Sequence, residues 1–349
     1  MVSSVINRRE LTKLFAAGLG VGREAMTSST VCVAAVQMTA ELANVESNLA
    51  KAELLMRTAF RRGARWVILP EVFASGIAFH PEMAKATRGT DGAPAQLLRK
   101  LARQGNAIVG GSFLAGRDGN VYNTFMLALP DGSTLRHDKD HPTFWENCYC
   151  VGGRDDGVLP TQQGNIGAAL CWEFIRSKTA VRLKGKVNMV VGGSCWWTAK
   201  DSDAVDHPFR RLGLDMLKAA PGTFARILGV PVVHASHAGR FVGQSWPGEA
   251  VPYPSHYLGE TQIVDGRGAV LARMSHEKGE GVITASLSLG PVSGEQLPIP
   301  DRFWIPEFSD GLHRQWENAL KSGHEYYLST TLPYVQRRFA RPAGKRKLK

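Results

Sequence analysis

A glutamate and a cysteine each follow a short apolar run, which is where α/β proteins place many of their working side chains. Glu71 comes after the run 66–69, and Cys171 comes after the run 166–170. A cysteine thiolate is a strong nucleophile, and a nearby carboxylate can remove the thiol proton. The stretch after Cys171 can open a helix, whose N–H groups would lower the pKa of the thiol and face a developing oxyanion. Each residue alone also fits a structural interpretation, Glu71 in a solvated loop and Cys171 as a small buried side chain.

A lysine in an acidic segment is the third candidate. Lys139 lies in the segment 138–141, 68 residues after Glu71 and 32 residues before Cys171. Taken alone, a lysine flanked by acids is typical of a protein surface. Here the lysine follows a hairpin-like unit at 129–135. A further glutamate, Glu146, follows closely behind it.

The remaining cysteines and the histidines do not define a second kind of site. Cys148 and Cys150 form a C-x-C pair, but the second pair of ligands that structural zinc requires does not follow. We therefore expect no metal site. A histidine could also activate a cysteine nucleophile, and the sequence does not single one out. The candidates are His137, His141, His207, His234 and His237.

The elements that must position these residues alternate along the chain. Short apolar runs predict strands at 31–36, 66–69, 107–110, 125–129, 166–170, 187–191 and 230–235. Apolar residues at helical spacing predict helices over 44–62 and from 94 to 105, and a further helix around 216–224. A hairpin-like pair at 261–272 precedes a last strand at 282–287. This pattern is typical of an α/β protein with mixed sheets.

Composition and charge exclude several classes of protein. Of the 349 residues, 44% are hydrophobic and 21% are charged, which excludes long disorder. Five cysteines are too few for a disulfide scaffold, and no apolar run is long enough for a transmembrane helix. The net charge is +11, but the segment 336–349 alone carries seven Lys and Arg and no acid. The body therefore has little excess charge, which argues against a nucleic-acid-binding face.

The two ends of the chain differ from the body. In the segment 1–29, Arg8 and Arg9 precede an uncharged stretch rich in Gly and Ala, which is the outline of a twin-arginine export signal. The alternative is an N-terminal arm on a cytoplasmic protein, because no clear cleavage site follows. After residue 290 several prolines predict an extended arm, and the basic run behind it is typical of a solvated tail. We therefore divide the chain into a leader or arm at 1–29, a main domain at 30–290, and an arm and tail at 291–349.

Several short motifs, taken in their order and spacing, resemble the nitrilase superfamily of carbon–nitrogen hydrolases, which use a Glu, Lys, Cys triad. The resemblance covers residues 30–290. The matching stretches are 34–38 (AAVQM), 69–71 (LPE), 122–124 (YNT), 130–132 (PDG), 138–139 (DK), 169–173 (ALCWE) and 262–265 (QIVD). Each motif is short, and their common order makes the resemblance specific.

The resemblance implies a role for each of four residues. Cys171 is the nucleophile, Glu71 is the general base, and Lys139 is the cation that stabilises the oxyanion. Glu146 corresponds to a further glutamate of the catalytic loop. The implied fold is a four-layer α-β-β-α sandwich that needs no cofactor or metal. Dimers and larger spirals are common in this family, so we expect a homodimer or a higher homo-oligomer.

The implied reaction is hydrolysis of a small amide or nitrile to a carboxylic acid and ammonia or an amine, through a thioester on Cys171. Asp138 and Asp140 flank the lysine where nitrilases more often have Arg or Leu, so amide and nitrile substrates both stay open. Two other classes remain. One is an acyltransferase or amidotransferase with the same triad, and the other is a non-catalytic binding protein that keeps the fold.

Four tryptophans lie near the candidate catalytic residues in the sequence. Trp145, Trp172, Trp196 and Trp197 can line an apolar pocket, or they can pack in the core. We expect Trp145, Trp172 and Trp196 to contact the substrate.

Overall fold

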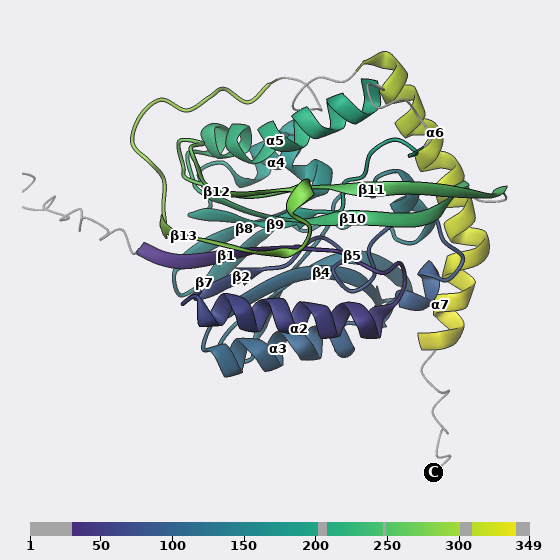
Figure 1. The fold of residues 1–349 in the computed structure, drawn as a ribbon, viewed down its shortest axis with the longest axis horizontal. Helices are drawn as coiled ribbons and strands as arrows, with labels where there is room; N and C mark the ends of the chain where they lie inside the picture. The colour runs from purple at the N-terminus through teal and green to yellow at the C-terminus, as the bar shows by residue number, and fades with distance from the viewer. Residues whose placement is uncertain (1–29, 202–207, 247–248, 301–308, 340–349) are drawn as a thin grey trace, which may run out of the picture.

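The computed structural model describes residues 30–201, 208–246, 249–300 and 309–339. They form an α/β fold in which one continuous 13-stranded sheet folds into two layers between two layers of helices (Figure 1). This arrangement confirms the four-layer α-β-β-α fold. The expected leader, 1–29, and the end of the basic tail, 340–349, lie outside the described residues. In the part that the structure describes, no helix is both long and apolar enough to span a membrane.

The first sheet layer comes mainly from the N-terminal half of the chain. Its strands follow the order β6-β5-β4-β2-β1, and β13 pairs antiparallel with β1 along most of its length. A short β3 pairs with the end of β4. The bounds are β1 (Thr30–Met38), β2 (Trp66–Ile68), β3 (Arg88–Gly89), β4 (Ile108–Arg117), β5 (Asn120–Ala128), β6 (Thr134–Asp138) and β13 (Gly281–Ser288).

The second sheet layer continues from the first through the parallel pairing of β1 with β10, at Gln37 opposite Ser236. Its order is β10-β9-β8-β7, with β11 beside β10 and β12 beside β11. The strands β10 and β11 form a hairpin that is much longer than the strand expected at 230–235. The bounds are β7 (Val158–Thr161), β8 (Gly164–Leu170), β9 (Met189–Ser194), β10 (Val232–Trp246), β11 (Glu249–Val264) and β12 (Val270–Ser275).

Both faces of each sheet layer are buried, and the side chains of a strand point alternately into the two cores. In β1, Val33 and Ala35 lie in the core between the two layers, whereas Ala34, Val36 and Met38 lie in the core beneath the first helix layer. Successive side chains of a strand point to opposite faces, so a strand that is covered on both sides must be apolar throughout. This explains why the predicted strands appear as uninterrupted apolar runs.

Helices cover the outer face of each layer (Figure 1). On the first layer lie α2 (Val45–Arg61) and α3 (Ala93–Gly105), close to the helices predicted at 44–62 and 94–105. The side chain of Asn44 caps α2 by accepting a hydrogen bond from the backbone N–H of Ser47. On the second layer lie α4 (Ser177–Leu183) and α5 (Pro208–Leu228).

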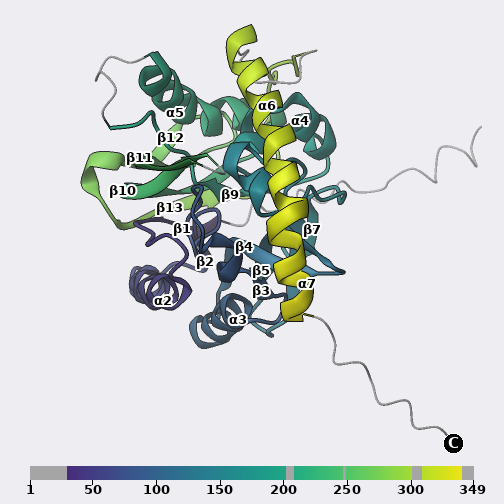
Figure 2. The same ribbon diagram turned by 90° about the vertical axis from the view of Figure 1, so that its right-hand side faces the viewer.

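The C-terminal segment differs from the expectation. An extended arm was expected after residue 290, and this is wrong for residues 310–339. They form α6 (Asp310–Tyr326), a π-helical turn (Tyr327–Thr331) and α7 (Leu332–Phe339), which run end to end along one side of the molecule (Figure 2). Every fourth residue of this helical segment is buried, at positions 319, 323, 327, 331 and 335. These positions share one face of the helix, but their mixed types (Ala, Gly, Tyr, Thr and Val) give no clear hydrophobic pattern.

The strand directions explain how distant residues meet. The strands β2, β8, β9 and β10 all run in the same direction as β1, and so does β4, which pairs parallel with β2. Because β5 is antiparallel to β4 and β6 is antiparallel to β5, β6 also runs in this direction. Their carboxyl ends therefore lie at one edge of the sheet. Glu71, Lys139 and Cys171 all follow the ends of these strands, at the edge where α/β folds gather their functional groups.

Candidate active site

Glu71 lies just beyond β2 and is almost fully buried. Its Oε1 accepts hydrogen bonds from Lys139 Nζ at 2.8 Å and from Asn123 Nδ2 at 2.9 Å. Its Oε2 accepts the backbone N–H of Cys195, which follows β9, at 2.9 Å. Three segments that are far apart in the sequence thus fix both oxygens of one carboxylate.

Lys139 follows β6, and its side chain is 1% exposed. The interpretation as a surface lysine is therefore wrong. Its ammonium lies between two carboxylates, 2.8 Å from Glu71 Oε1 and 2.5 Å from Glu146 Oε2. Burial lowers the pKa of Lys139, but the charges of Glu146 and Glu71 outweigh burial and raise this pKa well above its ordinary value. The lysine is therefore a cation at all physiological pH values.

Glu146 belongs to the 3₁₀ turn Phe144–Cys148, and its Oε2 accepts a hydrogen bond from Lys139 Nζ. The backbone N–H of Thr143 donates to its Oε2 at 2.7 Å, and Asn123 Nδ2 donates to its Oε1 at 2.7 Å. One amide group of Asn123 therefore contacts both carboxylates. The sequence analysis gave Asn123 no role, although it lies in one of the matched motifs (122–124).

Cys171 follows β8 and begins a 3₁₀ turn, Cys171–Ile175, rather than an α-helix. Its φ of +52° is unusual for a residue other than glycine and is maintained only where the surroundings hold the backbone in place. The expectation of a lowered thiol pKa is wrong. Burial, together with the nearby charge of Glu71, raises the pKa of Cys171 well above its ordinary value, although Lys139 acts in the opposite direction. The resting sulfur is therefore a thiol that needs a base.

The pKa of Glu71 suits it to act as that base. Burial raises this pKa, the charge of Lys139 lowers it, and the charge of Glu146 raises it again, with a result of about 7. A carboxylate with this pKa accepts a proton near neutral pH and also returns it. The structure thus brings together Glu71, Lys139, Glu146 and Cys171, which the sequence analysis singled out.

The expected tryptophans gather around the same turn. Trp145 stacks on Trp197 with ring centroids 4.4 Å apart, and Phe144 and Trp172 form a T-shaped pair with centroids 5.4 Å apart. Trp172 and Trp196 lie next to each other, with centroids 6.2 Å apart. All of these tryptophans are less than 10% exposed. These rings therefore form one buried aromatic cluster, joined through Phe144, next to Glu146 and Cys171 in the sequence.

Three of the candidate histidines, His137, His234 and His237, are hydrogen-bonded to groups other than Cys171. His137 lies between the carboxylates of Asp155 and Glu173, and His234 contacts Ser194. His237 lies between the backbone carbonyls of Met38 and Glu71, and burial lowers its pKa to about 4. His207 lies outside the described residues. The sequence did not reveal that Glu173 and His137 form an ion pair.

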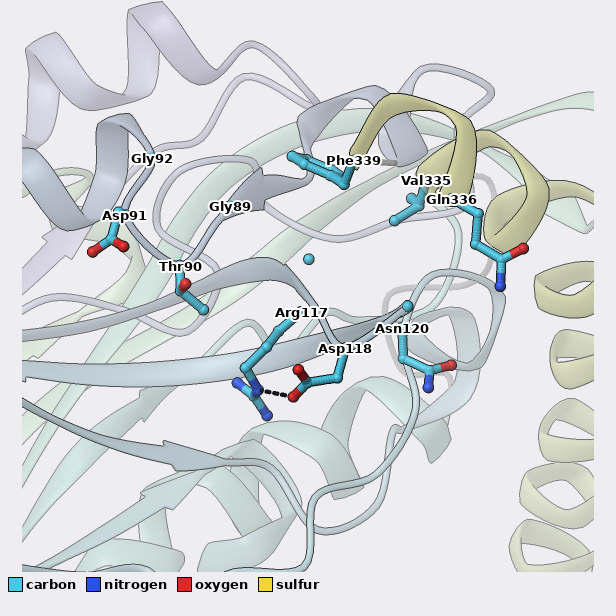
Figure 3. A pocket seen from close by; sticks show the side chains of 12 residues that line it. Gly89, Thr90, Asp91, Gly92, Arg117, Asp118, Asn120, Val335, Gln336 and Phe339 are labelled. Atoms are coloured by element: carbon cyan, nitrogen blue, oxygen red, sulfur yellow. Dashed lines mark hydrogen bonds and ion pairs between the residues drawn. The ribbon is translucent and has the colours of Figure 1, made fainter. Parts of the chain in front are cut away.

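A cavity of about 510 Å³ lies between the β4–β5 turn and α7, lined in part by Arg117, Asn120 and Phe339 (Figure 3). None of its lining residues belongs to the catalytic cluster. Within the described ranges, no group of three or more His, Cys, Asp or Glu side chains is arranged to hold a metal ion.

Solved structures share this fold. A carbon–nitrogen hydrolase from Helicobacter pylori superposes with a TM-score of 0.64 at 17% identity, over 74% of this chain and 89% of that chain. Nit3 of Saccharomyces cerevisiae superposes with a TM-score of 0.58 at 21% identity, over 74% of this chain and 90% of that chain.

Curated relatives are similar in sequence. An omega-amidase of Danio rerio is 30% identical over 183 residues, which is 46% of this chain and 65% of that protein. A nitrilase of Pyrococcus abyssi is 32% identical over 164 residues, 44% of this chain and 62% of that protein, so both are matched over slightly less than two thirds of their length. Nitrilase 3 of Arabidopsis thaliana is 27% identical over 297 residues, 77% of this chain and 82% of that protein. The profile of the carbon–nitrogen hydrolase family matches residues 32–293. The chain therefore belongs to the nitrilase superfamily of carbon–nitrogen hydrolases.

Proposed function

We propose that this protein is a thiol hydrolase that cleaves the carbon–nitrogen bond of a small amide or nitrile. The observation that carries the proposal is a buried ammonium, Lys139, held between the carboxylates of Glu71 and Glu146 beside the thiol of Cys171. A buried cation stabilises negative charge far better than one in water. The similarity to relatives named omega-amidase and nitrilase supports both substrate classes.

In the proposed reaction, Glu71 takes the thiol proton while the sulfur of Cys171 attacks the amide carbon. Negative charge moves to the substrate oxygen, where Lys139 and the backbone N–H of Trp172 stabilise it. Glu71 then gives its proton to the leaving nitrogen, and the tetrahedral intermediate collapses: the C–N bond breaks, ammonia or an amine leaves, and the acyl group stays on Cys171 as a thioester. Water, deprotonated by Glu71, cleaves the thioester to the carboxylic acid and restores the thiol.

A nitrile substrate requires one more water. Attack by Cys171 then gives a thioimidate instead of a tetrahedral oxyanion, and Lys139 stabilises charge on the nitrogen. Addition of a first water leads to loss of ammonia and to the same thioester. A second water then releases the acid as before, so one set of residues serves both substrates.

The aromatic residues near the catalytic groups suit an apolar acyl group. Trp145, Trp172 and Trp196 are proposed to contact this part of the substrate, because Trp145 precedes Glu146, Trp172 follows Cys171, and Trp196 packs beside Trp172. Binding there requires no charge on the acyl chain. We also propose that the protein forms a homodimer or larger homo-oligomer, which light scattering after gel filtration can test.

A panel of amides and nitriles tests the proposal, with ammonia release and the carboxylic acid measured together. Wild-type protein should yield one acid for each nitrogen released, and intact mass should show an acyl adduct that maps to Cys171. The variant Cys171→Ala should remain folded and lose activity by several orders of magnitude. Transfer of the acyl group to added hydroxylamine in preference to water would instead favour an acyltransferase. Undiminished turnover by Cys171→Ala would refute the role of the thiol.

A further inference from the structure

A second buried carboxylate lies directly behind the catalytic groups. Glu173 is fully buried, two residues after Cys171. Its Oε2 accepts the backbone N–H of Leu170 at 2.8 Å, and its Oε1 accepts the backbone N–H of Asp140 at 3.1 Å. Leu170 immediately precedes the nucleophile, and Asp140 immediately follows the catalytic lysine. One carboxylate thus ties together the backbones that carry the thiol and the ammonium.

His137 strengthens the same connection. It lies two residues before Lys139, and its Nε2 is 3.0 Å from Glu173 Oε2. Its Nδ1 is 2.5 Å from Asp155 Oδ1, and the other oxygen of Asp155 accepts the backbone N–H of Asp138 at 2.9 Å. Both ring nitrogens face carboxylates, so both donate and the ring is an imidazolium. Burial lowers the pKa of His137, but Glu173 and Asp155 raise it to about 10.

The hydrogen bonds of Glu173 and His137 link two segments that strand pairing in the sheet does not link. Lys139 follows β6, which is the end strand of the sheet order, whereas Cys171 follows β8 in the other layer. The two strands are not paired, so no backbone ladder fixes the distance between the ammonium and the thiol. Cys171 also has a positive φ, which the surroundings must maintain. The bond from Leu170 to Glu173 closes the 3₁₀ turn that holds this conformation.

We propose that Glu173 and His137 are positioning residues that hold the Lys139 segment against the Cys171 turn, so that the ammonium stays within reach of the charge that develops on the substrate. This inference rests on the proposed function, since it concerns the geometry of the same site. We assign neither Glu173 nor His137 a contact with the substrate. A misplacement of about 1 Å can cost roughly 100-fold in rate, so a fixed distance between ammonium and thiol is worth maintaining.

The first test is Glu173→Gln. Glutamine keeps the size of the side chain but has only one oxygen, so it accepts only one of the two backbone N–H groups. We expect kcat to fall about 100-fold, with a small change in KM. Since the charge of Lys139 lowers the pKa of Glu71, displacement of Lys139 should also move the acid limb of kcat/KM to higher pH. Loss of stability alone would reduce the amount of active protein without moving that midpoint.

The matched control is Glu260→Gln. Glu173 also pairs with Arg182, so its side-chain partners are an arginine and a histidine. Glu260 is a buried carboxylate on β11 with the same two kinds of partner, Arg273 and His276. The control should lose stability in the same way, with kcat and the acid midpoint unchanged. If it shows the same changes as Glu173→Gln, or if Glu173→Gln shows neither change, the positioning role is wrong.

His137→Gln provides a second variant in case Glu173→Gln does not fold. It removes the positive charge but keeps an N–H that can reach Glu173, and it should lower kcat and move the midpoint in the same direction. A folded His137→Gln variant with wild-type kcat and midpoint would overturn the proposal. Cys171→Ala distinguishes a failure of the proposed function from a failure of the positioning role. If that variant stays active, the proposed function fails, whereas an inactive Cys171→Ala beside a fully active Glu173→Gln refutes only the positioning role.

Discussion

The ammonium of Lys139 lies 2.8 Å from the carboxylate of Glu71, and both side chains are 1% exposed. A buried ion pair is costly to desolvate and is weak evidence for a stabilising role. Its partners here are the proposed base and the proposed oxyanion cation, so catalysis gives a reason for its presence. Burial raises the pKa of Glu71 and the charge of Lys139 partly offsets this, so the base titrates near neutrality, whereas Glu146 and Glu71 keep the lysine charged.

The first prediction concerns the shape of the cation. Lys139→Arg and Lys139→Ala should both lower kcat by about 100-fold or more, because a planar guanidinium cannot present its charge from the same point. Lys139→Ala should also lower the melting temperature, since two buried carboxylates lose their partner at a cost of about 3–5 kcal/mol. Steady-state kinetics and calorimetry measure the two effects. The control is Lys100→Arg, an exposed lysine that pairs with Glu53 and should change nothing. Wild-type activity in Lys139→Arg would contradict the role of Lys139.

The second prediction concerns the pH dependence of the reaction. Glu71 must be ionised to take the thiol proton, and its pKa is about 7. With a substrate that does not titrate, kcat/KM should therefore rise as the pH increases through about 7. Glu71→Gln should be inactive over the whole range. An acid limb with its midpoint near 4.5, the ordinary value for glutamate, would show that a different group is the base.

The third prediction concerns the pH dependence of stability, which the raised pKa of Glu71 also affects. The folded pKa of Glu71 lies above its unfolded value, so its contribution to stability is fully present below pH 4.5 and is lost as the pH rises through about 7. The free energy of unfolding of wild type, relative to Glu71→Gln, should therefore fall by roughly 3 kcal/mol between pH 4 and pH 8. Urea titrations across this range measure it. A difference that grows with pH would mean that Lys139, not burial, dominates the environment of Glu71.

The fold could be predicted from the sequence where local patterns agree with the tertiary structure. The run 66–69 is apolar because β2 is buried on both faces. The helix predicted at 44–62 could be recognised because its apolar residues recur at helical spacing on the face that is buried. The long β10–β11 hairpin was underestimated, since beyond residue 235 its strands contain glycines and charged or polar residues such as Arg240 and Gln244. Strand pairing in that part depends on the partner strand rather than on local composition.

The site could be predicted only in part. Glu71, Lys139 and Cys171 were found because each lies in a recognisable motif, and topology then brings the motifs to one edge of the sheet. Asn123 was given no role, and His137 was considered only as one of five histidines that could activate a cysteine, because a polar residue inside a strand gives no sign of which distant carboxylate it meets. The raised pKa of Cys171 was also beyond the sequence, since it depends on burial in the folded chain.

The fourth prediction separates the tail from the C-terminal helices. A chain that stops after Phe339 should keep its activity within about a factor of two, because a short polar terminus contributes little to folding. A chain that lacks residues 309–349 should lose most of its activity and melt at a lower temperature. In the full chain Thr331 Oγ1 donates to the carbonyl of Cys148, at the end of the turn that carries Glu146, and Tyr327 is fully buried against β5. Full activity in the longer truncation would contradict this support.

The last prediction tests the contact between α6 and the catalytic turn with a single methyl group. A Cβ added at Gly323 would lie 2.6 Å from the Cβ of Asn147, next to Glu146, so α6 or the turn must move. Gly323→Ala should therefore destabilise the protein by about 1–3 kcal/mol, as overpacking does, and lower kcat because Glu146 helps to hold Lys139. Gly311→Ala in the same helix is the matched control, since its Cβ would meet only Ser309 Oγ at 3.9 Å. That change should stabilise the helix by up to about 1 kcal/mol and leave kcat unchanged. Equal melting temperatures and equal kcat in the two variants would show that α6 does not restrain the turn that carries Glu146.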